Sequence, residues 1–382
     1  MREKNKIIRA ATVAQSCNFF RDVMIDMRER GYNMIALSSP GHQLDSIEDC
    51  GFHIIPISME RHISLKKDVV SLFKLIKVFR REHPQMVHSM TPKAGLLCMV
   101  AAWLTRVPVR VHTFTGLVFP TAQGLKRKIL MLTDAITCAC ATHIIPEGEG
   151  VKADLQNNGI TKKPMKILGY GNVRGIDMTR FSRRESIMRM AENLRDSDAF
   201  TFLFVGRIVR DKGINELVAA FKRLNEEFPK TRLWLVGHYE NELDPISISS
   251  QEIINESQNI NTLGTILGDE LIAYYAASDC FVFPSYREGF PNTVIEAGAM
   301  DLPCIVTDIN GSREIICQGE NGIIIPSKDE ELLYKAMKQM ITDEKGRKKM
   351  TGNARKMIAD RFEQSFVRQC LYDYYDEILP HR

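Results

Sequence analysis

Short apolar runs alternate with longer amphipathic stretches along most of this chain. The runs Ile7–Ala14, Met34–Ser39 and His53–Ile57 have the length and β-branched content of buried strands. Similar runs follow at Met86–Met90, Val109–Phe114, Thr142–Pro146, Thr201–Val205, Arg232–Val236, Cys280–Pro284, Cys304–Thr307 and Gly322–Pro326. Helices are expected over Met24–Arg30, Ile214–Glu227, 329–341, 344–360 and 364–379. Strands and helices in this order predict an α/β protein with parallel, doubly wound sheets.

The alternation stops between residues 171 and 198, where turn-forming and charged residues replace the apolar runs. It resumes at Thr201 in the same order. A chain of 382 residues is long enough for two such domains. We therefore expect Rossmann-like domains over 1–172 and 200–363, joined by a linker region over 173–199.

The stretch 65–81 predicts an amphipathic helix. Apolar residues recur at positions 65, 69, 72, 73, 76 and 79, which is a helical period. The polar face is cationic and carries Lys66, Lys67, Lys74, Lys77, Arg80 and Arg81.

The net charge of +4 hides an asymmetry between the two halves of the chain. Residues 1–180 hold 26 Lys and Arg against 15 Asp and Glu, whereas residues 181–382 hold 25 against 32. A basic half suits phosphate groups, acidic lipids or nucleic acid, although solvated charged faces would give the same count. Nucleic acid is not expected, because no aromatic platform is interleaved with the basic residues.

Several classes of protein and site do not fit the composition. The nine cysteines are scattered without a Cys-x-x-Cys pair, so we expect free thiols in a reducing cytoplasm. The longest apolar run, 95–104, is about half of a membrane span. No apolar signal core precedes Ile7, so a cytoplasmic protein is expected. Asp196 and Asp198 have a metal-binding spacing but fit a solvated turn, and no metal site is predicted.

The stretch 283–300 has the pattern of a strand, a tight loop and a helix start. This geometry aims free backbone N–H groups at an anion, so we interpret the loop as the place that holds a phosphate-bearing sugar donor. The backbone amides of Gly289, Phe290, Pro291, Asn292 and Thr293 surround this turn, Pro291 contributing no N–H. The loop holds Glu288, and the first turns of the helix hold Glu296. Glu296 is placed to accept from ribose hydroxyls, although a carboxylate there also suits the helix dipole.

A second candidate lies in the first strand-to-helix loop of the second domain. There the strand ends at Gly206, and Arg207 and Lys212 follow before the next helix. A diphosphate leaving group needs two or more cationic donors when no metal is present, and these two residues supply them. An ordinary basic surface loop would look the same.

Together these segments resemble the retaining glycosyltransferases of the GT-B fold, family 4, over essentially the whole chain. The resemblance rests on the Glu288-x₇-Glu296 pair, its Pro284-to-Asn292 context and the Gly206–Gly213 loop. It implies two Rossmann-like domains facing an interdomain cleft, with the last helix, 364–382, packing back on the first domain. It also implies that Arg207 and Lys212 hold the donor diphosphate, Glu296 the ribose, and Glu288 with 289–293 the sugar.

The first domain departs from the family pattern at two places. Gln15 and Ser16 stand where relatives carry a Gly-Gly loop, and Thr115 stands where a sugar-binding His is usual. His112 lies three residues before Thr115 and fits either a sugar contact or a strand residue facing the core. Lys93, at a helix start, resembles a segment of bacterial surface-polysaccharide enzymes and is a candidate for an acceptor phosphate.

The expected activity is transfer of a sugar from a nucleotide diphosphate sugar to an acceptor hydroxyl, as in capsule or O-antigen assembly. The resemblance implies retention at the anomeric carbon, a hexosyltransferase-type reaction and no metal or other cofactor. We favour a UDP-sugar and a lipid-linked acceptor carried on polyprenyl diphosphate, with the basic first domain against the inner face of the cytoplasmic membrane. A GT-B-like sugar-nucleotide epimerase and a non-catalytic sugar-binding protein are the alternatives.

Overall fold

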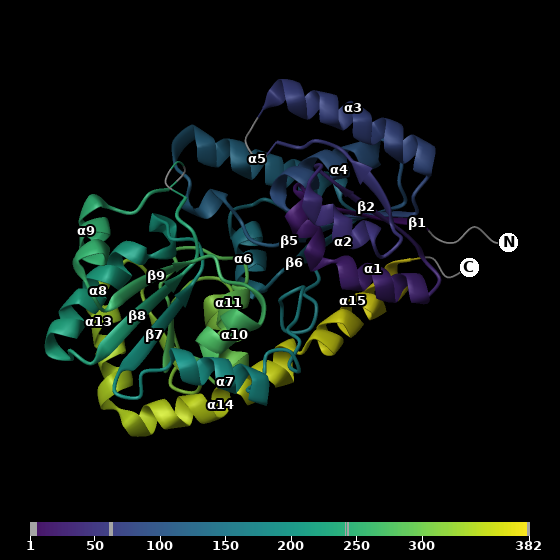
Figure 1. The fold of residues 1–382 in the computed structure, drawn as a ribbon. Coiled ribbons are helices and arrows are strands. Elements are labelled where there is room, and N and C mark those ends of the chain that lie inside the picture. Colours follow the sequence, from purple (N-terminus) through teal and green to yellow (C-terminus); the bar gives the residue numbers. More distant parts are fainter. Residues whose placement is uncertain (1–5, 61–63, 241, 243, 380–382) are drawn as a thin grey trace. The chain divides into compact units, whose positions relative to one another are not determined.

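The computed structural model describes residues 6–60, 64–240, 242 and 244–379, and the chain forms two compact units. Unit 1 comprises residues 1–174 and 365–382, and unit 2 comprises residues 175–364. Each unit is built around its own six-stranded sheet (Figure 1). All strand pairs in both sheets are parallel, which confirms the predicted α/β class.

The sheet of unit 1 has the order β3-β2-β1-β4-β5-β6. Its strands are β1 (Lys6–Ala10), β2 (Asn33–Ser38), β3 (His53–Pro56), β4 (Met86–Met90), β5 (Val109–Phe114) and β6 (His143–Pro146). The helices are α1 (Arg21–Glu29), α2 (Asp45–Glu48), α3 (Leu65–Glu82), α4 (Pro92–Leu104), α5 (Gly124–Cys140), α6 (Glu149–Asn157) and α15 (Gln364–Ile378). Helices α3, α4 and α5 share one apolar core with the sheet, and α1 and α15 share the other. The sheet is therefore covered on both faces, as parallel sheets are.

Unit 2 repeats this plan with the strand order β12-β11-β10-β7-β8-β9. Its strands are β7 (Phe200–Val205), β8 (Thr231–Val236), β9 (Ile260–Gly264), β10 (Cys280–Phe283), β11 (Cys304–Thr307) and β12 (Gly322–Ile325). The helices are α7 (Glu185–Leu194), α8 (Ile214–Glu227), α9 (Ile248–Glu256), α10 (Gly268–Ala277), α11 (Asn292–Ala299), α12 (Ser312–Ile315), α13 (Glu330–Thr342) and α14 (Glu344–Phe362). The stretch expected to be a linker contains α7, whose Ile187 and Ala191 are buried in the core of unit 2.

The two sheets change direction at equivalent places. In unit 1 the order reverses between β1 and β4, and in unit 2 it reverses between β7 and β10. Ligands of doubly wound sheets bind beyond the carboxyl ends of the strands at such a switch point. The loops after these four strands are therefore the ones that can form a site.

Three sequence-based expectations were wrong in detail. The first strand ends at Ala10 and not at Ala14, because the chain turns into a 3₁₀ segment at Ala14–Phe19. Strand β9 was not predicted, since it lies at the sheet edge and only Ile260 of its residues is buried. On α3 the buried positions are Ser71, Leu75, Val78 and Phe79, so half of the predicted apolar stripe (positions 65, 69 and 73) faces outward.

Candidate donor site

The loops after β7 and β10 meet at the switch point of unit 2. Gly213, which begins α8 after the first loop, has a φ of +72°. A Cβ there would lie 2.1 Å from the carbonyl oxygen of Pro284, so the close approach of the two loops requires glycine. Two hydrogen bonds to the carbonyl oxygen of Asp211 join the loops, one from the backbone N–H of Tyr286 at 2.8 Å and one from Ser285 Oγ at 3.3 Å.

Lys212 and Glu288, predicted from separate segments, form an ion pair in this site. Both side chains are largely buried, and the same Glu288 oxygen accepts a hydrogen bond from Ser285 Oγ at 2.8 Å. The Lys212 ammonium also lies 5.3 Å from the centroid of the Phe283 ring, a cation–π distance. Lys212 is therefore held by one carboxylate, one aromatic face and the loop geometry.

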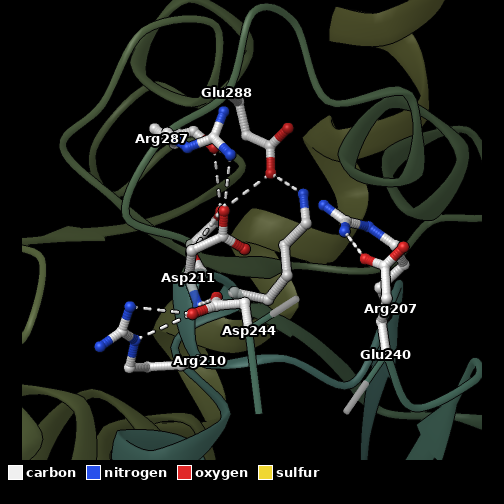
Figure 2. Close-up of polar contacts among 9 residues, drawn as sticks. Arg207, Arg210, Asp211, Glu240, Asp244, Arg287 and Glu288 are labelled. Atoms are coloured by element: carbon white, nitrogen blue, oxygen red, sulfur yellow. Dashed lines mark hydrogen bonds and ion pairs between the residues drawn. The ribbon is translucent and has the colours of Figure 1, made fainter. Parts of the chain in front are cut away.

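Arg207 projects from the same loop and pairs with Glu240, which follows β8. Figure 2 shows this pair beside a second set of contacts, in which Arg287 Nη2 donates to Asp211 Oδ2 at 2.8 Å. Arg210 pairs with Asp244, whose other oxygen accepts from the backbone N–H of Asp211 at 2.7 Å. The carboxylates at 240 and 244 were missed by the sequence interpretation, although the chain after β8 must lie beside the loop after β7.

Glu296 lies on the first turns of α11, as the pattern predicted. Its carboxylate accepts a hydrogen bond from Tyr275 Oη at 3.1 Å. Burial and the adjacent Glu296 charge raise the pKa of Tyr275 well above its ordinary value, so the phenol keeps its proton and donates. Glu296 thus has a defined orientation in the second turn of α11.

The segment 289–293 is divided between core and surface. Phe290 is buried and packs edge-on against Phe362 with ring centroids 5.4 Å apart. Gly289 and Pro291 are also buried, whereas Asn292 and Thr293 are half-buried at the start of α11. Side chains of this segment that a ligand could reach are thus those of Asn292 and Thr293.

The candidates in unit 1 occupy different environments. Gln15 is exposed and Ser16 half-buried in the 3₁₀ segment after β1, and Thr115 is half-buried just after β5. Lys93 donates to Asp68 Oδ2 at 2.6 Å, with both side chains mostly buried. Beside Lys93, the hydroxyls of Thr12 and Thr91 lie 2.7 Å apart, and Thr91 has a φ of +73°, a strained value for a β-branched residue.

His112 is part of the core of unit 1. It is 1 % exposed, and its Nδ1 lies 2.9 Å from Ser89 Oγ. A Cβ on Gly95 would come within 2.4 Å of the imidazole, so the ring fills the space that this glycine leaves in α4. Burial lowers the pKa of His112 to about 3, which keeps the ring neutral. Of the two alternatives for His112, the geometry favours the core residue.

A buried cationic cluster in unit 1 was also missed. Arg9 is 4 % exposed and uses Nη1 to contact both His88 Nδ1 at 2.8 Å and Tyr375 Oη at 2.5 Å. Tyr375 lies on α15, so the cluster fastens the last helix to β1 and β4. No sequence pattern connects residues that are 366 positions apart.

The acidic and cysteine residues form no site of their own. No group of three or more His, Cys, Asp or Glu in the described part of the chain could hold a metal ion. Asp196 accepts from Arg232 Nη2 at 2.5 Å, and Asp198 lies 3.6 Å from Lys230. All nine cysteines are free thiols. Within the described residues, no helix combines the length and apolarity needed to cross a bilayer.

Comparison with known proteins identifies the family of this chain. Residues 19–171 match the family described as glycosyl transferase 4-like domain, and residues 188–357 match glycosyl transferases group 1. The chain is 32% identical to the capsular polysaccharide biosynthesis glycosyltransferase CapM of Staphylococcus aureus, over 99% of this chain and 98% of that protein. It is 29% identical to the UDP-Gal:alpha-D-GlcNAc-diphosphoundecaprenol alpha-1,3-galactosyltransferase of Escherichia coli, over 86% of this chain and 84% of that protein.

A solved structure shows the same fold at low sequence identity. Anabaena Alr3699/HepE in complex with UDP superposes with a TM-score of 0.78 at 16% identity, covering 97% of this chain and 100% of that one. The full-length similarity to CapM and the two family matches favour a transferase over the epimerase and the sugar-binding protein. The chain belongs to the glycosyltransferases of the GT-B fold, family 4.

Proposed function

We propose that this glycosyltransferase moves a hexose from a UDP-sugar to a hydroxyl of a polyprenyl-diphosphate-linked acceptor, in capsule or O-antigen assembly. The observation that carries the proposal is the Lys212–Glu288 ion pair at the switch point between β7 and β10. Arg207 lies in the same loop as Lys212, and Glu296 lies on the helix that follows β10. The names of the Staphylococcus and Escherichia relatives, a capsular polysaccharide glycosyltransferase and a diphosphoundecaprenol galactosyltransferase, support the pathway and the lipid-linked acceptor.

In this proposal Arg207 and Lys212 bind the donor diphosphate. Each cation exchanges its carboxylate partner, Glu240 or Glu288, for phosphate oxygens. The charge that grows on the diphosphate as it departs is then neutralised by groups already in place. Two side-chain cations supply the role that a metal would otherwise fill, so we propose that the reaction needs no metal.

The other donor contacts come from α11 and its loop. Glu296, oriented by Tyr275, accepts from the ribose hydroxyls. Glu288, once released from Lys212, contacts the transferred sugar together with Asn292 and Thr293. Backbone amides of the loop 289–293 contribute further donors, since the chain enters α11 there.

We further propose that the sugar is transferred with retention through a front-face route. The acceptor oxygen forms a bond to the anomeric carbon while the bond from that carbon to the phosphate oxygen breaks on the same face. The acceptor proton passes to the departing phosphate oxygen. In unit 1, Gln15, Ser16, Lys93 and Thr115 are the candidates for acceptor contacts, and Lys93 would first have to leave Asp68.

A membrane-bound acceptor places the reaction at the inner surface of the cytoplasmic membrane. The basic first half of the chain, with its excess of 11 Lys and Arg over acidic residues, supports this location. A peripheral attachment is consistent with the lack of a spanning helix among the described residues.

The donor can be identified by thermal shift in the presence of UDP, GDP and ADP. A ligand at 100 times its Kd adds about 2.7 kcal/mol to the stability of the domain that binds it. We expect the largest shift with UDP and a smaller shift in a Glu296→Gln variant. A larger shift with GDP or ADP would contradict the UDP assignment. The anomeric coupling in the product's NMR spectrum tests retention, and an inverted product would rule out the front-face route.

A further inference from the structure

Most of the large apolar side chains that are exposed in the described residues lie on the helix layer α3–α4–α5 of unit 1. Of the 17 exposed large apolar side chains in the described residues, ten lie on these three helices. Helix α4 contacts both α3 and α5, and the three form one layer over the sheet of unit 1 (Figure 1). We call their solvent-exposed side the α3–α5 face.

Helix α5 contributes a continuous apolar stripe to this face. Leu125, Ile129, Leu132 and Ile136 follow one another at intervals of three or four residues, so they lie along one side of the helix. Leu125 is 73% exposed and Leu132 is 60% exposed. The core of unit 1 does not take up this stripe, because α5 turns Thr137 and Cys138 inward instead.

Helix α3 presents apolar and basic side chains together. Val69, Val70 and Phe73 are all more than half exposed. Lys74 and Lys77 are exposed beside them, and neither forms an ion pair with any residue that the structure describes. Apolar side chains flanked by unpaired lysines are the pattern of a helix that lies in a lipid headgroup layer.

The remaining part of the layer has the same character. Trp103 and Leu104 are exposed at the end of α4, and Arg106 follows them. On α5, Lys126 and Lys128 are exposed next to Leu125. A tryptophan beside cationic residues is typical of the membrane–water interface.

We infer that the α3–α5 face docks on an anionic lipid bilayer, with the apolar side chains of α3, α4 and α5 inserted among the headgroups. The lysines and arginines attract the anionic surface, and the apolar stripe supplies a part of the binding that salt does not screen. The inference that this face binds a bilayer is argued from exposed side chains and charge. Only the purpose of that binding rests on the proposed lipid-linked acceptor. Docking would hold the acceptor side of the enzyme where a polyprenyl diphosphate leaves the membrane.

Vesicle sedimentation tests the inference directly. The full-length protein is mixed with zwitterionic vesicles or with vesicles that contain phosphatidylglycerol, at about 0.1 M and about 1 M NaCl. We expect sedimentation with the anionic vesicles at low salt and a reduced but persistent bound fraction at high salt. Protein that stays in the supernatant with every vesicle would overturn the inference.

Matched variants distinguish binding through this face from nonspecific adsorption to vesicles. Leu125→Ser with Leu132→Ser should lower the partition coefficient at least about tenfold, and most clearly at high salt. Lys74→Gln with Lys77→Gln should weaken binding to anionic vesicles at low salt by about thirtyfold. As the control, Ile248→Ser with Leu332→Ser removes exposed apolar side chains of unit 2 and should change nothing.

Two further measurements close the test. Light scattering of the free protein should show a monomer. Self-association that the Leu125 and Leu132 changes abolish would mean that a second copy covers the face, and would overturn the membrane assignment. UDP binding by all of these variants should equal that of the unchanged protein. A failure of the proposed donor site would appear as absent UDP binding while vesicle binding persists, so the two proposals fail separately.

Discussion

Replacing Glu240 by Gln should tighten the binding of UDP. In the structure, Glu240 pairs with Arg207, so it occupies the cation that we propose for the diphosphate. Glutamine keeps the size and one hydrogen-bond acceptor of the side chain but removes its charge. The competition for Arg207 then falls, and Arg207 is free for phosphate without first breaking an ion pair.

The exposure of the pair sets the size of the effect. The Arg207 side chain is 39% exposed and that of Glu240 is 22% exposed. Ion pairs open to solvent contribute about 0.2–1 kcal/mol. Removal of the competing carboxylate should therefore lower the Kd for UDP by roughly 1.4- to fivefold. Inhibition by the product UDP should strengthen by the same factor.

Isothermal titration with UDP measures this change, and Glu242→Gln is the control. Glu242 lies two residues away, is exposed, and forms no ion pair within the described part of the chain. Glu242→Gln removes the same charge without affecting a partner of Arg207. The Kd of this variant for UDP should therefore stay close to that of the unchanged protein. In an Arg207→Ala background, Glu240→Gln should also have little effect. Weaker UDP binding in Glu240→Gln alone would refute the reasoning and would mean that Glu240 positions Arg207.

Three further outcomes are expected. Lys212→Ala should raise the barrier by about 2.7–4 kcal/mol, a loss of roughly 100- to 1,000-fold in kcat, while circular dichroism stays unchanged; near-normal turnover would remove Lys212 from the site. Turnover after exhaustive EDTA treatment should match that of the untreated enzyme, and loss that Mg²⁺ or Mn²⁺ restores would contradict metal independence. Because burial lowers the pKa of His112 to about 3, below the unfolded value of about 6.5, stability is fully present above pH 6.5 and is lost as the pH falls toward 3. Urea unfolding between pH 5.5 and 4 should show a loss that approaches about 1.4 kcal/mol per pH unit for this histidine, and His112→Asn should flatten that part of the slope.

The sheets were predictable because their strands are buried on both faces. Met86–Met90, Val109–Phe114 and Cys304–Thr307 are strands with the bounds expected from the apolar runs. A strand covered on both sides needs apolar residues throughout, so the ends of the apolar run mark the ends of the strand. Strand β9 lies at an edge with most of its side chains exposed, and the same reasoning could not detect it.

Helix α3 shows where periodicity stops being informative. Two stripes of the segment 65–82 are apolar, and only one of them packs on the sheet. A hydrophobic period states that a helix has an apolar side, but it cannot choose between two such sides. Which side of α3 is buried depends on how the helix packs against α4 and the sheet. A local sequence pattern does not determine that packing.

The site divides in the same way between local and tertiary information. Arg207 and Lys212 could be found because glycines mark the loop after a buried strand, and Glu288 and Glu296 because a strand, loop and helix start frame them. The pairing of Lys212 with Glu288 and the presence of Glu240 could not be found without the strand order β10-β7-β8, which brings the loops after three separate strands together. That order gives each phosphate-binding candidate a carboxylate, Glu288 for Lys212 and Glu240 for Arg207. The sequence therefore identifies the cations that we propose for the diphosphate, whereas the fold identifies the carboxylates that a diphosphate bound there would displace, and the affinity for the donor would depend on both.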